Sequence, residues 1–492
     1  MGANVSKVSL NDNEIGIREA VISKYIGIRK KSSLTQKAVA DKMGVSPQVV
    51  AKFESLKSTP TLKFLVKYAN VLGQTISFDL INTINTEKNS QNVITDKVKE
   101  EKIFDIYNAL NNDKTHMVST DDICTPMECV KLMIDYIPSS FWKNENIKVL
   151  DPCCGNGNFG AYCSLKTKMD NIWFYDLNEV RLENCKRILN PKNIFKMDSL
   201  TIDNYGQWDL IMANPPYSGG GNKNQSLSKQ FIEHSVKLVK NGGYLCFVAP
   251  NNWMSYNTNN TTLKSLLTEG SFVVIDNDIH KYFSSVGSSF TVFVWQKGVY
   301  NNKTYVKNNY VIKDEQHDVE IPNDLPFIPL YISQNTINIQ KKMMLNEDNN
   351  QFFYRCDLHN FTKSDCLSDE KNNIFKYETI HTARKTRYAK LKQDIFSKWL
   401  IIVPLSTYYV PYIKHKVNVT QSVGYMAFDT KKSANEAMKK ITQSCYKFII
   451  HLTRYGNFNN IMVLKHLNFR NDIDLTEQEI EFIEFFVSKI AY

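Results

Sequence analysis

Residues 149–159 read VLDPCCGNGNF, and this stretch decides which fold we expect. The apolar pair Val149-Leu150 predicts a short strand, after which Gly155 and Gly157 let the backbone turn tightly and leave room for a bound molecule. Asp151 ends the strand, where it can accept a hydrogen bond from an amino group or from an ordered water. The glycines do not follow the G-x-G-x-x-G spacing and no lysine follows them, which disfavours the binding of a nucleotide phosphate. An ordinary glycine turn is the alternative interpretation.

Apolar runs that alternate with helical patterns surround this loop. They lie at residues 149–150, 173–174, 210–211 and 245–247. Their spacing predicts an α/β sheet between Ile123 and about Lys297. Asp176 follows the second run, and an acid about twenty residues beyond a glycine loop can accept both hydroxyls of a ribose. Asp198 follows a third predicted strand at 194–197, where it can bond an adenine amino group, although either acid by itself is typical of a solvated loop.

A second motif, WDLIMANPPY at residues 208–217, places two prolines directly after an apolar strand. Pro215 and Pro216 stiffen the turn and remove backbone donors. The side-chain oxygen of Asn214 and the carbonyl of Pro215 are then left to accept the two N–H groups of an exocyclic amine. Such acceptors stabilise the positive charge that grows on the nitrogen when it attacks a methyl group. Tyr217 can stack on a base that has been rotated out of a duplex.

The residues Asn214-Pro215-Pro216-Tyr217 resemble the catalytic motif of the S-adenosylmethionine-dependent amino-methyltransferases of DNA. The N-P-P-Y form is similar to the adenine-N6 type. The resemblance implies S-adenosylmethionine as the cofactor and the N6 nitrogen of a flipped adenine in duplex DNA as the methyl acceptor. Cytosine-C5 enzymes use a Pro-Cys nucleophile in this region, whereas here Pro152-Cys153 lies in the cofactor loop.

The order of the motifs resembles the gamma, or TaqI-like, arrangement, because Cys124-Thr125-Pro126 precedes the glycine loop as the cofactor-covering helix of that family does. The resemblance implies a set of residues that contact the cofactor: Thr125, Pro126, Asp151, Cys153, Gly155, Gly157, Asp176, Asp198 and Asn214. It also implies that a phenylalanine before the final hairpin stacks on the flipped adenine. Phe283 matches that position best and Phe290 is the alternative, while a core aromatic is the competing interpretation of either residue.

The segment Leu34–Leu72 resembles the lambda-repressor-like helix-turn-helix family. Two helix N-caps and the turn between the helices are predicted at Thr35, Ser46 and Gly44. Gln36 and Gln48 would open the second and third helices, where their amides can bond an adenine edge or a phosphate. The segment departs from the family at Ser55-Leu56, where Glu-x-Gly is common. A helical bundle used for dimer contact is the alternative.

Two further segments are candidates for contact with DNA. The loop 218–224 is rich in glycine and contains Lys223, and we expect it to order on DNA and close over the target base. The run 381–392 is basic and offers phosphate contacts through Arg384, Lys385 and Arg387. Such a run is more often a solvated helix face. By its position, the region Pro326–Tyr492 is predicted to be a target-recognition domain.

The composition fits this interpretation. The 492 residues include 60 Lys and Arg against 50 Asp and Glu, a net charge of +10 that suits a nucleic-acid partner. Ten cysteines occur without a C-x-x-C pair, so we expect reduced thiols and no metal site. No signal-peptide pattern or bilayer-spanning run is seen, which predicts a cytoplasmic protein of prokaryotic, phage or plasmid type, associated with the nucleoid and not with a membrane.

The predicted fold class is α/β: a Rossmann-like methyltransferase domain with an N-terminal all-α helix-turn-helix domain and a C-terminal mixed domain. The predicted boundaries are a helix-turn-helix at 13–80, a linker with a helix at 81–115, the catalytic domain at 116–300, a linker at 301–325 and the target-recognition domain at 326–492. The expected partners are double-stranded DNA and a separate cognate restriction endonuclease, and a homodimer through the helix-turn-helix stays open. The alternatives are methylation of RNA or of a protein glutamine, and a non-catalytic regulator on a methyltransferase scaffold.

Overall fold

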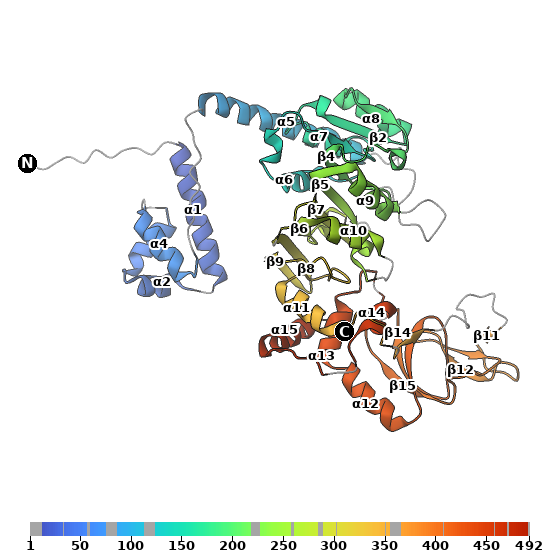
Figure 1. Ribbon diagram of the computed structural model, residues 1–492. Helices are drawn as coiled ribbons and strands as arrows, with labels where there is room; N and C mark the ends of the chain where they lie inside the picture. Colours follow the sequence, from blue (N-terminus) through green and yellow to red (C-terminus); the bar gives the residue numbers. More distant parts are fainter. Residues whose placement is uncertain are drawn as a thin grey trace, which may run out of the picture. The chain divides into compact units, whose positions relative to one another are not determined.

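A computed structural model shows the chain as two compact units, residues 1–92 and 93–492, which are described separately (Figure 1). The structure describes residues 12–32, 34–56, 60–74, 86–112, 124–217, 227–256, 260–283, 289–301, 303–349, 351–354, 366–406, 408–456, 458–469 and 472–490. None of the helices in these ranges has the length and apolar character that crossing a bilayer requires.

The first unit is built from four helices. They are α1 (Asp12–Lys31), α2 (Gln36–Met43), α3 (Pro47–Glu54) and α4 (Leu62–Val71). Thr35 caps α2 as predicted, because its hydroxyl oxygen accepts a hydrogen bond from the backbone N–H of Ala38 at 3.1 Å. Gly44 ends α2 in the left-handed conformation, with φ of 64°. Ser46 stands at the N-cap of α3 but makes no side-chain capping bond, so its predicted capping bond is absent. Leu56, where the family often has glycine, has φ of 62°.

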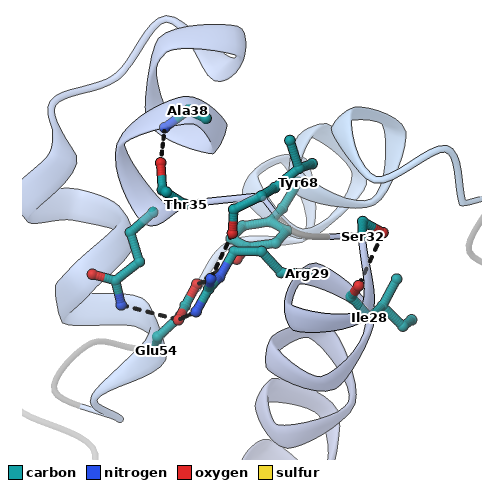
Figure 2. A network of polar contacts seen from close by, with 9 residues as sticks. Ile28, Arg29, Ser32, Thr35, Ala38, Glu54 and Tyr68 are labelled. Atoms are coloured by element: carbon teal, nitrogen blue, oxygen red, sulfur yellow. Dashed lines mark hydrogen bonds and ion pairs between the residues drawn. The ribbon is translucent and has the colours of Figure 1, made fainter.

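One carboxylate joins all four helices of this unit (Figure 2). Glu54 on α3 accepts two hydrogen bonds from the guanidinium of Arg29 on α1, both at 2.6 Å. It also accepts one from the hydroxyl of Tyr68 on α4 at 2.5 Å and one from the amide of Gln36 on α2 at 3.0 Å. The side chains of Glu54 and Arg29 are only 5% and 10% exposed. The network therefore fixes how the helices pack around their small apolar core.

The stability of this unit is expected to depend on pH through Glu54. Burial alone raises the pKa of this carboxyl, but the hydrogen bonds from Arg29, Gln36 and Tyr68 outweigh burial and lower it. A lowered folded-state pKa stabilises the unit above the unfolded value of about 4.3, and that contribution is lost as the pH falls through the folded value. The unit should therefore keep its full stability from pH 7 to about pH 5 and lose it in stronger acid.

Hydrogen exchange of peptides from residues 34–56, corrected for the intrinsic effect of pH, measures this dependence in the full chain. The matched control is Glu54→Gln, which cannot ionise. We expect wild type to be the better protected at pH 7 and the two proteins to converge in acid. A difference in protection that is equally large at pH 7 and pH 3 would contradict the assignment.

The second unit contains a nine-stranded sheet of strand order β3-β2-β1-β4-β5-β7-β6-β8-β9 (Figure 1). Its strands are β1 (Val149–Asp151), β2 (Ile172–Asp176), β3 (Ile194–Lys196), β4 (Trp208–Ala213), β5 (Val239–Pro250), β6 (Gly270–Asp276), β7 (Phe290–Lys297), β8 (Thr304–Tyr310) and β9 (Ile312–Val319). Strands β1 to β5 pair in parallel, and β7 is antiparallel to both β5 and β6. This is the predicted Rossmann-like fold.

Helices cover both faces of this sheet, which explains why its central strands β1 and β4 are buried at every position. The helices are α5 (Thr86–Asn112), α6 (Met127–Asp135), α7 (Asn158–Cys163), α8 (Glu179–Leu189), α9 (Leu227–Leu238) and α10 (Thr261–Glu269). Leu210 and Met212 of β4 pack with α6, α7 and α8, whereas Ile211 and Ala213 pack with α9 and α10. The chain reverses its direction of strand addition between β1 and β4, and ligands bind at such a point.

Helix α7 approaches β2 so closely that one position admits only glycine. A Cβ atom on Gly160 would lie 2.1 Å from Cε1 of the buried Phe174 ring. We expect Gly160→Ala to lower the free energy of unfolding by about 2 kcal/mol, because a packed ring cannot move aside freely. Gly27, in α1, has no neighbour within 4 Å of its Cβ position, so Gly27→Ala should be neutral or stabilising. Denaturant unfolding of both variants tests this, and equal stability of Gly160→Ala and wild type would refute the close approach.

The helix predicted within residues 81–115 is present as α5, whereas the linker predicted at 301–325 is a hairpin. Residues 301–325 contain the β8–β9 hairpin, and β8 pairs in parallel with β6, so the linker prediction there is wrong. Thr304, Val306 and Asn308 point inward and are buried, while alternate residues point outward, which gave the segment the polar composition of a linker. In the other segment, Tyr107 of α5 is fully buried and its hydroxyl donates a hydrogen bond to the carbonyl of Asn156 at 3.1 Å. The sheet unit therefore includes residues on both sides of the predicted 116–300 domain.

The C-terminal region is mixed, as predicted. It contains two four-stranded sheets of order β10-β17-β14-β15 and β11-β13-β12-β16. The strands are β10 (Phe353–Tyr354), β11 (Leu367–Ser368), β12 (Tyr377–Ile380), β13 (Thr386–Ala389), β14 (Trp399–Pro404), β15 (Tyr412–His415), β16 (Asn418–Val419) and β17 (Val423–Phe428). The helices are α11 (Gln334–Met343), α12 (Lys431–Ile441), α13 (Ser444–His451), α14 (Ile461–His466) and α15 (Glu477–Ser488). The basic run 381–392 lies on the β12–β13 hairpin and the turn after it, not on a helix.

Candidate functional site

A cavity of about 370 Å³ lies where β1, β2 and β4 end, at the point where the direction of strand addition reverses. Its lining includes ten of the residues that the sequence singled out: Cys124, Thr125, Cys153, Gly155, Asp176, Asp198, Asn214, Pro215, Pro216 and Tyr217. The glycine loop and the proline loop thus share one cavity, although they lie far apart in the chain. The shared wall follows from the topology, because parallel neighbouring strands end at the same edge of the sheet.

Asp176 holds the glycine loop in its conformation. One carboxylate oxygen accepts a hydrogen bond from the backbone N–H of Gly155 at 2.7 Å, and the other accepts one from the N–H of Asn178 at 2.8 Å. Gly155 and Gly157 have φ of 51° and 91°, which L side chains rarely adopt. A carboxylate has about four acceptor positions, so Asp176 can still accept hydroxyl groups of a ligand.

Asp151 lies behind the cavity as a buried carboxyl group without a compensating positive charge. It is fully buried, and neither of its oxygens makes a hydrogen bond of standard geometry within the described residues. Burial, and then the nearby charge of Asp176, raise the pKa of this carboxyl well above its usual range. S-adenosylmethionine carries an ammonium group and a sulfonium, so a bound positive charge would compensate for the cost of this carboxylate. The orphaned carboxylate and the glycine-walled cavity fit that cofactor.

Asn214 is held from three directions. Its side-chain Nδ2 donates to Oγ1 of Thr125 at 3.0 Å, and the hydroxyl of Tyr217 donates to its Oδ1 at 2.8 Å. The thiol of Cys153 contacts its backbone carbonyl oxygen at 3.6 Å. The ring of Tyr217 packs on Phe290, with the centroids 5.1 Å apart. Asn214, which would accept the target amine, therefore contacts Thr125 and Cys153 of the cofactor cavity as well as Tyr217 of its own loop.

Four of the predicted cofactor and base contacts do not line the cavity. Pro126 is the N-cap of α6, and Gly157 faces Cys185 behind the loop. Phe283 is 1% exposed and packs on Phe290 with ring centroids 5.1 Å apart, which is the core-aromatic arrangement. Asp151 likewise stays behind the lining.

The sequence missed several residues of the lining. Arg181 on α8 is 8% exposed, lines the cavity and lies against Gly155. Asn158, at the start of α7, donates from Nδ2 to the backbone carbonyl of Thr125 at 2.9 Å. The signal for both was position: Arg181 follows Asp176 by little more than one helical turn, and Asn158 directly follows the glycine loop.

The predicted DNA contacts lie on separate elements. Gln48 is exposed on α3, whereas Gln36 is partly buried because its amide bonds Glu54. Arg384 is exposed in the β12–β13 turn. Lys385 and Arg387 both pair with Asp369, at 3.0 and 2.7 Å, which neutralises part of their charge. Lys223 and the loop 218–224 lie outside the described residues.

Two segments of the chain match known families. Residues 129–282 match the methyltransferase small domain, and residues 28–78 match a helix-turn-helix family. The chain is 26% identical over 246 residues to the type II methyltransferase M.HincII of Haemophilus influenzae, a match that covers 45% of this chain and 46% of that protein. It is 30% identical over 127 residues to the ribosomal RNA small subunit methyltransferase C of Shewanella sediminis, covering 25% of this chain and 35% of that one. The chain spans less than half the length of either relative.

Among solved structures, the type IIG restriction endonuclease BpuSI aligns with a TM-score of 0.38 at 13% identity, over 97% of this chain and 73% of that one. The match at 129–282 contains strands β1 to β6 and most of the cavity lining, and the match at 28–78 contains α2, α3 and α4. The chain therefore contains a methyltransferase domain of the kind that uses S-adenosylmethionine, and a helix-turn-helix domain before it.

Proposed function

We propose that this methyltransferase domain acts on DNA, transferring a methyl group from S-adenosylmethionine to the N6 nitrogen of an adenine that has been flipped out of a specific duplex site. The observation that carries the proposal is the place of Asn214 and the two prolines, on the wall of the same cavity as the glycine loop. The similarity to a type II methyltransferase and the helix-turn-helix match favour DNA as the substrate. A restriction-modification or orphan enzyme is the expected type.

Residues in and behind the cavity would hold the cofactor and the base without a covalent intermediate. Asp176 would accept the ribose hydroxyls, Asp198 the adenine amino group, and Asp151 would lie near the ammonium group. When bound, S-adenosylmethionine supplies an electrophilic methyl group on a positively charged sulfur. Asn214 Oδ1 and the carbonyl of Pro215 would accept the two N–H groups of the target amine, and these acceptors stabilise the charge that develops on its nitrogen.

The remainder of the chain would hold the duplex. The net charge of +10 favours a polyanionic partner. Exposed Gln48 in the first unit and exposed Arg384 in the C-terminal region are the candidates for base and phosphate contacts. Tyr217 is the candidate for stacking on the flipped base. A separate restriction endonuclease and a homodimer through the first unit remain part of the proposal.

Methylation of RNA is the second candidate, because ribosomal RNA methyltransferases are among the similar proteins. Transfer of labelled methyl from S-adenosylmethionine to unmethylated duplex DNA, compared with ribosomal RNA, separates the two. Single-molecule sequencing of DNA from cells that express the chain then gives the modified base and its context. We expect N6-methyladenine in one short motif. Label found in RNA alone, or in N4-methylcytosine, would overturn the proposed substrate.

A further inference from the structure

The contact between Thr125 and Asn214 joins two sites that act on different molecules. Thr125 precedes α6 and lines the cofactor cavity, and Asn214 lies 89 residues later on the proline loop. Their side chains meet at 3.0 Å, with Nδ2 of Asn214 donating to Oγ1 of Thr125. Thr125 is 4% exposed and Asn214 is half-buried, so the bond has limited access to water.

The chemistry of the target amine makes this contact necessary. Two N–H groups of an adenine amine can only donate when the lone pair attacks, so Asn214 must present its oxygen to them. The amide nitrogen of Asn214 then points away from the base and needs an acceptor of its own. An amide N–H with little access to water is unfavourable without an acceptor, and Oγ1 of Thr125 is an acceptor that lies there.

The hydroxyl of Tyr217 occupies the oxygen of Asn214 in the same network, at 2.8 Å. The target amine has to share the oxygen with this hydroxyl or exchange with it, because an amide oxygen accepts at two lone pairs. Thr125, on the opposite side of the amide, keeps its bond while that exchange takes place. Thr125 would therefore hold the side chain of Asn214 in one orientation while the target base enters the site.

Thr125 is also fixed to the glycine loop. Its backbone carbonyl accepts a hydrogen bond from Nδ2 of Asn158 at 2.9 Å, and Asn158 begins the helix after that loop. A cofactor in the cavity would contact this loop and would restrict the movement of the residues around it. The hydrogen bond of Thr125 and the thiol contact of Cys153 would pass this restriction on to Asn214.

We infer that Thr125 is a positioning residue that couples occupation of the cofactor cavity to the orientation of Asn214, so that the target amine is accepted best when the cofactor is in place. The inference rests on the proposed function for the identity of the amine. The coupling is reciprocal, because two ligands that share one ordered element must affect each other equally.

A double-mutant cycle tests the coupling without any DNA. The variants are Thr125→Val, which keeps the shape of the side chain and removes the hydroxyl, Asn214→Ala, and both together. Calorimetry measures their affinity for sinefungin, an unreactive analogue of the cofactor. We expect Thr125→Val to weaken binding about tenfold when Asn214 is present and about twofold or less in the Asn214→Ala background, since coupled residues are not additive. An equal loss in both backgrounds would overturn the inference.

Single-turnover methyl transfer gives a second, independent readout. Thr125→Val should slow the step about tenfold, and Thr125→Ser, which restores the hydroxyl, should recover at least half of the wild-type rate. A rate for Thr125→Ser as low as that of Thr125→Val would contradict a role for the hydroxyl. If wild type transfers no methyl to DNA, the proposed substrate is wrong, and the sinefungin cycle still decides whether Thr125 is coupled to Asn214.

Discussion

Replacing Asn214 by alanine is expected to lower the rate of methyl transfer at least about a thousandfold, because it removes the side-chain acceptor that stabilises charge on the amine nitrogen. Thermal unfolding should change little, since Asn214 lies in a loop at the edge of the cavity and its backbone carbonyl stays in place. The measurement is single-turnover transfer from labelled S-adenosylmethionine, with circular dichroism as the check on folding.

The control for Asn214→Ala is Asn252, an exposed asparagine that does not line the cavity. Asn252→Ala should transfer methyl at the wild-type rate. A folded Asn214→Ala protein with wild-type turnover would contradict the role of Asn214 as the acceptor of the target amine and the mechanism that depends on it.

Replacing Glu54 by alanine is expected to unfold the helix-turn-helix unit, or to destabilise it by about 3–5 kcal/mol, which is the usual cost of breaking a buried ion pair by removing one partner. Arg29 would keep a buried positive charge, and the hydroxyl of Tyr68 and the amide of Gln36 would each lose an acceptor. Hydrogen exchange of peptides from the first unit measures the loss.

Asp41 gives a charge-matched control, because it is an exposed acid on α2 of the same unit. Asp41→Ala should exchange almost as wild type does. The sinefungin affinity of Glu54→Ala should also match wild type, because the cofactor cavity belongs to the second unit. Normal protection of the first unit in Glu54→Ala would show that the network does not hold the helices together.

Local motifs could be predicted from the sequence because each depends on a few neighbouring residues. The glycine loop follows β1 and the proline loop follows β4, and adjacent parallel strands bring such loops to one edge. Thr35 and Gly44 were recognisable because helix ends need specific side chains and dihedral angles. The family match to the methyltransferase small domain confirms the catalytic fold that these motifs predicted.

Contacts between distant residues could not be predicted in the same way. The pair Thr125–Asn214 and the pair Arg29–Glu54 depend on how elements pack, which no periodicity encodes. Phe283 was assigned to base stacking by its position in a motif, yet the structure buries it against Phe290. The strand β8 was taken for a linker because only alternate residues of it are apolar or buried.

The β8–β9 hairpin has a practical consequence for anyone who divides the gene. An expression fragment that stops at residue 300 deletes β8, one of the two strands that pair with β6. The backbone groups of Val274 to Asp276 that pair with β8 would then meet solvent. An exposed strand edge can pair with the edge of another molecule. Such a fragment is therefore expected to precipitate or to elute as oligomers in size-exclusion chromatography. A fragment that ends after β9, beyond Val319, keeps β8 and so keeps the edge of β6 paired.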